Sequence, residues 1–201
     1  MLPVARCAEV LERGAVLIDT RPAFQFAPRH ASGALNIGLD GQFASWVGTL
    51  VRPDQDILLV CEPGREQEAV MRLARVGYER VIGILEGGIE AWEVAGRPVA
   101  SFGLEPVAEA IRPGRTVLDV RRSGEWSSFH VHGAVNIPLA RLADEAAALD
   151  RDAPYTIVCA GGYRSAIAAS VLERMGFADL VATSGGLDAY RKAGESSGLP
   201  G

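Results

Sequence analysis

The feature that most constrains this sequence is a long internal repeat. The segment His30–Ile37, HASGALNI, recurs one hundred residues later as His130–Ile137, HVHGAVNI. Solenoid repeats have periods of roughly 20–50 residues, so a period of this length predicts two whole domains. A seam with Gly and Pro near Gly96–Gly103 interrupts the pattern. We therefore expect one domain over residues 1–98 and a second over residues 104–201.

Both halves alternate apolar, strand-like runs with helix-like segments. In the first half we expect strands over 15–19, 56–60 and 81–85, and helices over 3–13, 43–50, 66–76 and 89–95. In the second half we expect strands over 116–120, 156–158 and 180–182, with helices between them. This alternation predicts an α/β fold, in which each domain has a parallel sheet with helices on both faces. Ligands of such sheets bind beyond the carboxyl ends of the strands, where Cys61 and Cys159 would lie.

The bulk properties exclude several classes of function. The formal net charge of −5 gives no reason to expect a nucleic-acid partner. No segment is apolar for long enough to span a membrane, and the first residues lack the pattern of a secretory signal. Three widely spaced cysteines do not form a disulfide framework. We therefore expect a cytoplasmic protein with reduced thiols.

The second cysteine of the repeat, Cys159, opens a short polar loop after an apolar run. The loop Cys159–Ser165 reads CAGGYRS, and a helix-like stretch follows it. Backbone N–H groups of such a loop and the positive end of the helix dipole favour an anion. A setting of this kind can lower a cysteine pKa from roughly 8.5 into the range of about 3.5–7.5. We therefore expect Cys159 to act as a nucleophilic thiolate.

The other loop residues have chemically distinct roles in this prediction. Gly161 and Gly162 would take the positive φ values that let several N–H groups converge on the sulfur. Arg164 would attract an anionic donor, and Ser165 would cap the following helix. Ala160 and Tyr163 complete the anion-binding loop.

The corresponding loop of the first half, which begins at Cys61, is expected to be degenerate. Glu66 stands where the second loop has its arginine, and carboxylates near a thiol raise its pKa and repel anions. Pro63 also removes one N–H group from the loop. Gly64 remains, and Arg65 compensates only in part. We expect a non-catalytic remnant at Cys61.

Together, these segments resemble the rhodanese-like (sulfurtransferase) family. The resemblance of the second half rests on Asp119–Arg121, Glu125–Trp126, His130–Pro138, Cys159–Ser165 and Gly185–Tyr190. It implies that Cys159 takes a sulfane sulfur from thiosulfate or a low-molecular-weight persulfide, becomes a persulfide, and passes the sulfur to a thiol or cyanide. It implies no cofactor.

The first half resembles a more particular group. Gly41–Gly48 and Glu62–Ala69 are similar to the rhodanese tail of metallo-β-lactamase-fold persulfide dioxygenase fusions. This resemblance implies a persulfide dioxygenase as a partner or a fused domain. The three histidines do not form the His-x-His-x-Asp-His string of that metal-binding fold, so we expect no metal site.

Two other functions fit parts of the sequence. A rhodanese-like pair could be a non-enzymatic docking or regulatory module, since its first half is expected to be inactive. A Cys-dependent phosphatase or arsenate reductase is less favoured. Phosphatases place five residues between the cysteine and the arginine to hold a phosphate, whereas four residues separate Cys159 from Arg164.

Outside the loops, we expect Asp119 to pair with a nearby arginine and His130 to order a turn. We expect Asp19 and His30 to do the same in the first half.

Overall fold

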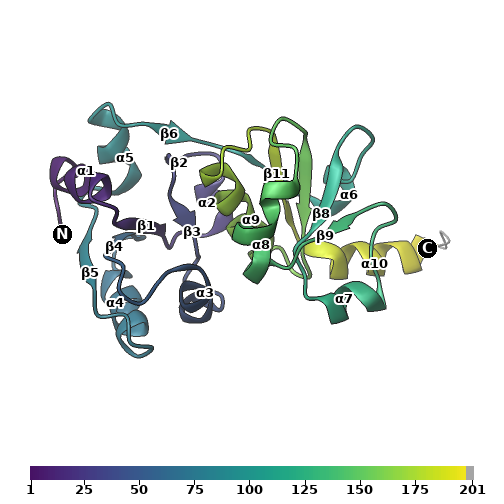
Figure 1. Cartoon of the computed structure of the whole chain (residues 1–201), viewed down its shortest axis with the longest axis horizontal. Coiled ribbons are helices and arrows are strands. Elements are labelled where there is room, and N and C mark those ends of the chain that lie inside the picture. Colours follow the sequence, from purple (N-terminus) through teal and green to yellow (C-terminus); the bar gives the residue numbers. More distant parts are fainter. Residues whose placement is uncertain (198–201) are drawn as a thin grey trace. The chain divides into compact units, whose positions relative to one another are not determined.

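The computed structural model describes residues 1–197, so the last four residues of the expected second domain, 198–201, lie outside the described residues. The chain divides between Ser101 and Phe102 into two compact units (Figure 1). We describe each unit by itself.

The first unit is built on a parallel sheet. Its elements are α1 (Val4–Glu12), β1 (Val16–Asp19), α2 (Ala23–Phe26), β2 (His30–Ala31), β3 (Leu35–Asn36), α3 (Phe43–Leu50), β4 (Ile57–Val60), α4 (Glu66–Ala74), β5 (Val81–Ile84), α5 (Gly88–Val94) and β6 (Val99–Ala100). The strand order is β3-β1-β4-β5, and every pairing in this sheet is parallel. A parallel bridge between Leu2 and Leu85 lies beside β5, and β2 pairs with β6 as a short antiparallel ribbon.

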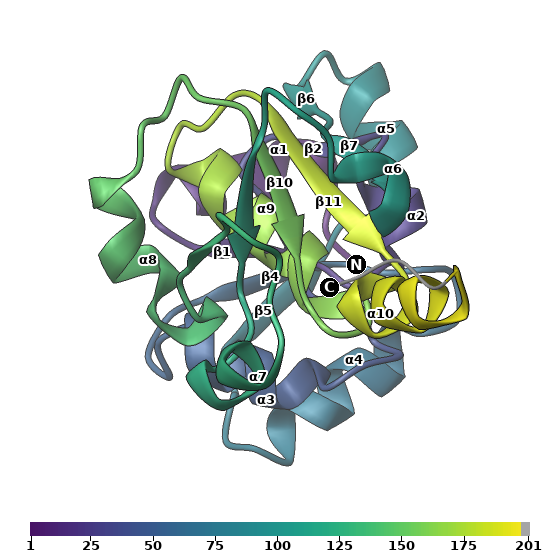
Figure 2. The same cartoon turned by 90° about the vertical axis from the view of Figure 1, so that its right-hand side faces the viewer.

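The central strands of this sheet are apolar because both of their faces are covered. All four residues of β1 and all four of β4 are buried. Helices α3 and α4 pack on one face, and α1 and α5 lie on the other (Figures 1 and 2). Sheets that are buried on both faces need continuous apolar runs rather than alternation. This is the pattern on which the α/β prediction was based.

The second unit repeats this architecture with one more full strand. Its elements are β7 (Gly103–Pro106), α6 (Val107–Ala110), β8 (Thr116–Asp119), α7 (Ser123–Ser128), β9 (Val135–Asn136), the 3₁₀ turn η1 (Leu139–Arg141), α8 (Leu142–Glu145), the 3₁₀ turn η2 (Ala146–Ala148), β10 (Tyr155–Val158), α9 (Tyr163–Arg174), β11 (Leu180–Ser184) and α10 (Gly186–Ser197). The strand order is β7-β11-β10-β8-β9, all parallel.

Helices cover both faces of the second sheet. In Figure 2, α9 lies behind the sheet of this unit, and α6 and α10 lie in front of it. Apolar residues of α6, β8, β10 and α10 form one buried cluster: Val107, Val117, Val158 and Leu187. The expected α/β class, with a parallel sheet between helices in each domain, is confirmed. Across residues 1–197, no helix combines the length and the apolar character needed to cross a bilayer.

Candidate active site

Cys159 lies at the carboxyl end of β10, in the middle of the second sheet. Its side chain is almost completely buried, with 1% of the residue exposed. The N–H of Gly162 donates to the Cys159 Sγ over 3.1 Å. Helix α9 begins at the next residue, so the sulfur lies at the positive end of a twelve-residue helix. A backbone N–H group and the positive end of a helix dipole together form an arrangement that can bind an anion.

Two glycines hold the backbone of the Cys159 loop in place. Gly162 has a φ of +91°, and a Cβ there would lie only 3.0 Å from the backbone nitrogen of Gly185. Gly186 has a φ of +59°, and its Cβ would lie 2.2 Å from the carbonyl oxygen of Ala160. Side chains at these positions would therefore push the loop away from the 185–186 turn. The positive φ expected at Gly161 is wrong, because among the loop glycines only Gly162 has one.

The start of α10 fixes the same loop through hydrogen bonds. The N–H of Leu187 donates to the carbonyl of Cys159 over 2.7 Å, and the N–H of Asp188 donates to the carbonyl of Ala160 over 3.1 Å. The backbone carbonyls of Cys159 and Ala160 thus bind to α10, while the N–H of Gly162 donates to the sulfur. Ala160 is half-buried and Gly161 is exposed, so the outer part of the loop is its open side.

Ser165 has a different role from the one expected. It lies in the first turn of α9 rather than at the N-cap, which is Gly162. Its hydroxyl donates to the carbonyl of Gly162 over 2.7 Å and is 2.8 Å from the carbonyl of Thr183. The prediction that Ser165 caps the helix is therefore wrong. Ser165 ties the start of α9 to β11.

Arg164 does not present a free positive charge. Its Nη1 and Nη2 donate to the two carboxylate oxygens of Glu125 over 2.8 and 2.7 Å. The bidentate hydrogen bonding from Arg164 lowers the pKa of Glu125 to about 2. Arg164 therefore joins α9 to α7, a contact that our sequence reasoning missed. The repeat holds a signal for it, since both partners change in the first half, to Gln25 and Glu66.

Cys61 occupies the equivalent place at the end of β4, but its surroundings disfavour a thiolate. Burial raises the pKa of Cys61 to about 11, and the negative charges of Glu66 and Asp19 act in the same direction. A hydrogen bond with Thr20 and the charge of Arg65 act in the opposite direction without offsetting them. The thiol is therefore protonated at neutral pH.

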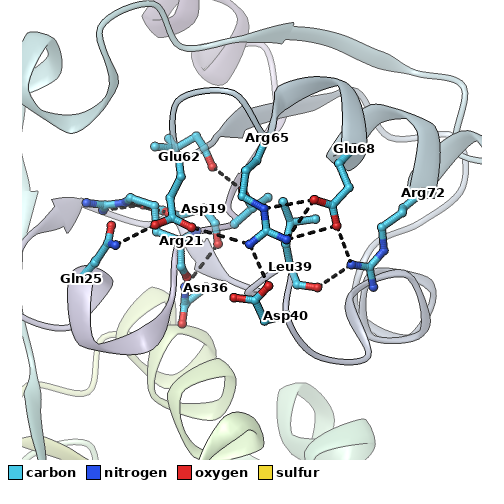
Figure 3. A network of polar contacts seen from close by, with 12 residues as sticks. Asp19, Arg21, Gln25, Asn36, Leu39, Asp40, Glu62, Arg65, Glu68 and Arg72 are labelled. Carbon is cyan, nitrogen blue, oxygen red and sulfur yellow. Dashed lines mark hydrogen bonds and ion pairs between the residues drawn. The ribbon is translucent and has the colours of Figure 1, made fainter.

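Carboxylates surround the arginine of the Cys61 loop (Figure 3). Arg65 forms ion pairs with Asp40 at 2.7 Å, Glu68 at 2.9 Å and Glu62 at 3.7 Å. Arg72 of α4 also pairs with Glu68, at 3.3 Å. Three carboxylates thus share the guanidinium of Arg65, which leaves it engaged within the protein.

The Cys61 loop also differs in how closely the following glycine turn approaches it. Gly88 is equivalent to Gly186 and has nearly the same φ, +60°. Its Cβ would meet only the Glu90 Oε2, at 3.5 Å, whereas that of Gly186 would collide with the Cys159 loop. The close contact between loop and turn is therefore a property of the second unit.

The Asp–Arg pairs expected at the strand ends are present in both units. Arg121 Nε donates to both carboxylate oxygens of Asp119 at 3.0 Å, and Arg121 Nη2 donates to the carbonyl of Phe129 over 2.6 Å. Arg21 and Asp19 repeat this arrangement. Because these side chains are buried and hydrogen-bonded to one another, they fix the loops that follow β1 and β8.

The histidines of the repeat order local turns, as expected. His130 Nδ1 lies 3.0 Å from the carbonyl of Trp126 and the two rings stack. His30 makes the same contact with Phe26. Within the described part of the chain, no three His, Cys, Asp or Glu side chains gather so as to hold a metal ion.

A family model and curated relatives match this chain. The model of the rhodanese-like domain matches it twice, over residues 4–95 and 104–193. Thiosulfate sulfurtransferase GlpE of Pseudomonas fluorescens strain SBW25 is 34% identical over 85 residues, which are 42% of this chain and 78% of that protein. GlpE of Shewanella oneidensis is 32% identical over 77 residues, or 38% of this chain and 76% of that protein.

Solved structures give similar matches. A thiosulfate sulfurtransferase from Pseudomonas aeruginosa is 24% identical with a TM-score of 0.43. That alignment covers 96% of this chain and 42% of the other, so this chain spans less than half of that protein. A rhodanese-related protein from Thermoplasma volcanium is 32% identical with a TM-score of 0.42, over 46% of this chain and 93% of that one.

Proposed function

Because this chain belongs to the rhodanese-like domain family, with two copies of the domain, we propose that it is a sulfurtransferase that carries sulfur on Cys159. Similarity to thiosulfate sulfurtransferases supports sulfur transfer as the class of reaction. The donor is thiosulfate or a low-molecular-weight persulfide, and the acceptor is a thiol or cyanide.

The reaction consists of two sulfur transfers. The Cys159 thiolate attacks the outer sulfur of thiosulfate, the bond between the two donor sulfurs breaks, and sulfite leaves with the bonding electrons. The product on the protein is the persulfide anion Cys159–S–S⁻. Cyanide then attacks the outer sulfur of the persulfide, thiocyanate leaves, and the thiolate returns. Atoms and charge balance in both steps without a cofactor.

One observation carries this proposal: the Cys159 sulfur accepts the Gly162 N–H at 3.1 Å at the start of α9. An N–H group and a helix terminus that already face the sulfur stabilise its negative charge without reorganisation. In this proposal the backbone of residues Ala160–Ser165 forms the anion-binding loop, while the side chains of Arg164 and Ser165 are engaged within the protein.

For the first unit we propose a non-catalytic role. Cys61 has a pKa of about 11, and Gly64 and Arg65 lie in a loop crowded with carboxylates. A reducing compartment such as the cytoplasm suits the proposed reaction because it keeps Cys159 reduced. A persulfide dioxygenase, as a partner or a fused domain, is part of the same proposal.

Thiocyanate formation from thiosulfate and cyanide tests the site assignment. We expect Cys159→Ser to abolish turnover because serine cannot form the persulfide. The matched variant Cys61→Ser should keep the activity of the unmodified protein. Full activity in Cys159→Ser would reject Cys159 as the sulfur carrier, and loss in Cys61→Ser would reject a non-catalytic first unit.

A further inference from the structure

The loop arginine of the second unit is held by a carboxylate of another helix. Arg164 and Glu125 make two hydrogen bonds of 2.8 and 2.7 Å, a fork-to-fork contact in which both partners are charged. The side chains are 18% and 34% exposed, so water screens this pair less than it would a fully exposed one. The guanidinium is therefore occupied before any donor arrives.

The Arg164–Glu125 and Arg121–Asp119 ion pairs carry no net charge. Arg164 is balanced by Glu125, and Arg121 is balanced by Asp119. Cys159 and Asp119 both lie close enough to Arg164 to raise its pKa, after the larger effect of Glu125. With Cys159 as a thiolate, these five groups carry one net negative charge. A donor with two negative charges meets more repulsion there than a donor with one.

The first unit indicates that the carboxylate and the arginine belong together. The positions of Glu125 and Arg164 hold Gln25 and Glu66 there, so both members of the pair are lost. Gln25 donates instead to Glu62, over 2.7 Å. The carboxylate on α7 is thus present in the unit whose loop carries the arginine, and it forms an ion pair with that arginine.

We propose, on the basis of the sulfur-transfer function above, that Glu125 is a specificity-determining residue that directs Cys159 toward singly charged sulfane donors. By engaging Arg164, Glu125 removes the cation that a dianion such as thiosulfate requires. Thiosulfonates and persulfides, whose reacting group carries one negative charge, are then the favoured class of donor.

Two donors that undergo the same reaction isolate the effect of charge. Thiosulfate is a dianion that releases sulfite. Methanethiosulfonate is a monoanion that releases methanesulfinate as its sulfur–sulfur bond breaks, and it leaves the same persulfide on Cys159. The measured quantity is the ratio of kcat/KM for thiosulfate to kcat/KM for methanethiosulfonate, with cyanide as the acceptor of both.

We expect Glu125→Gln to raise this ratio by about 3- to 10-fold, because one unit charge at short range in water-like surroundings has an effect of this order. Arg164→Gln should lower the ratio, since it leaves the negative charge of Glu125 unbalanced.

Asp179→Asn is the matched control. Asp179 precedes β11 at the amino ends of the strands and pairs with Arg115, so this variant changes the net charge equally without touching the loop. Its ratio should stay within about twofold of the unmodified protein.

Ionic strength gives a second test that needs no variant. Salt screens the dianion more than the monoanion, so the ratio of the unmodified protein should rise with added salt. A falling ratio would mean that a free cation attracts thiosulfate and would overturn the proposal. An unchanged ratio of kcat/KM values in Glu125→Gln, with both donors still active, would also overturn the proposal. Neither of these two results would count against sulfur transfer on Cys159 itself. Absence of turnover with both donors would instead reject the sulfurtransferase function, and the inference with it.

Discussion

Cys159 and Cys61 are equivalent positions of one repeat with different chemistry. Cys159 is buried and receives an N–H hydrogen bond at the start of a long helix, whereas Cys61 is partly exposed and lies near the carboxylates of Glu66 and Asp19. Both cysteines follow a central strand of the same kind of sheet, so the difference in their surroundings arises from the residues of the loops around them and not from the fold.

The raised pKa of Cys61 predicts slow alkylation. With a pKa of about 11 instead of 9.0, its thiolate fraction at neutral pH is roughly a hundredth of that of an ordinary cysteine. In Cys159→Ser, iodoacetamide labelling of Cys61, followed by peptide mass spectrometry, should therefore be slow at pH 7. Its rate should still be increasing as the pH rises through 9 to 10. A rate that levels off below pH 9 would contradict the raised pKa.

Individual residues of the site were predictable to different degrees. The place of Cys159 at a strand end follows from an apolar run, a cysteine and a glycine-containing loop, and its role as a nucleophile stays a prediction. The role of Ser165 did not follow, because its hydroxyl contacts Thr183, far away in sequence. The Arg164–Glu125 contact depends on how α7 lies against α9, which local sequence does not determine. Only the paired change to Gln25 and Glu66 in the repeat pointed to it.

At the scale of elements, α7 and α9 are joined by the Glu125–Arg164 pair, and this contact depends on pH. The pKa of Glu125 is lowered from 4.5 to about 2, so the pair contributes stability above pH 4.5 and loses it as the pH falls toward 2. We expect Glu125→Gln to be less stable than the unmodified protein at pH 7, with a difference that narrows between about pH 5 and pH 3. Thermal unfolding across this range measures the difference, and a constant gap would contradict the prediction.

The turn before α10 supports the Cys159 loop, and its counterpart before α5 provides a matched control. Alanine at Gly186 or Gly88 must adopt a positive φ, which costs about 1 kcal/mol in either unit. Only at Gly186 does the added Cβ collide with the Ala160 carbonyl. We therefore expect Gly186→Ala to lower the rate of thiocyanate formation roughly 10- to 100-fold, because the sulfur is displaced. Gly88→Ala should leave the rate unchanged, and equal losses in both would contradict this role of the turn.

Regular elements with a strong local pattern were predicted closely, and short ones were not. Helix α3 has the expected bounds Phe43–Leu50, and β1 and β4 differ from the expected strands by one residue at their starts. Strand β7 was missed because Gly103–Pro106 lacks an apolar run and is defined by its pairing with β11. The 3₁₀ turns around α8 were missed for a similar reason, since they lack a periodic pattern long enough to indicate a helix.

At the scale of the whole molecule, the repeat places two sheets of the same topology in one chain. The orders β3-β1-β4-β5 and β9-β8-β10-β11 correspond strand by strand, and the Leu2–Leu85 bridge lies where the second unit has β7. The chain therefore has two cysteines at equivalent strand ends, and the proposed function assigns sulfur to one of them.

Intact-mass spectrometry with peptide mapping, after exposure to methanethiosulfonate or thiosulfate, tests this assignment most directly. We expect one added sulfur atom per chain, located on Cys159 as a persulfide and removed by cyanide. Cys61→Ser should gain the same single sulfur, and Cys159→Ser should gain none. Sulfur on Cys61, or a persulfide that persists in Cys159→Ser, would contradict the central claim that Cys159 alone carries the transferred sulfur.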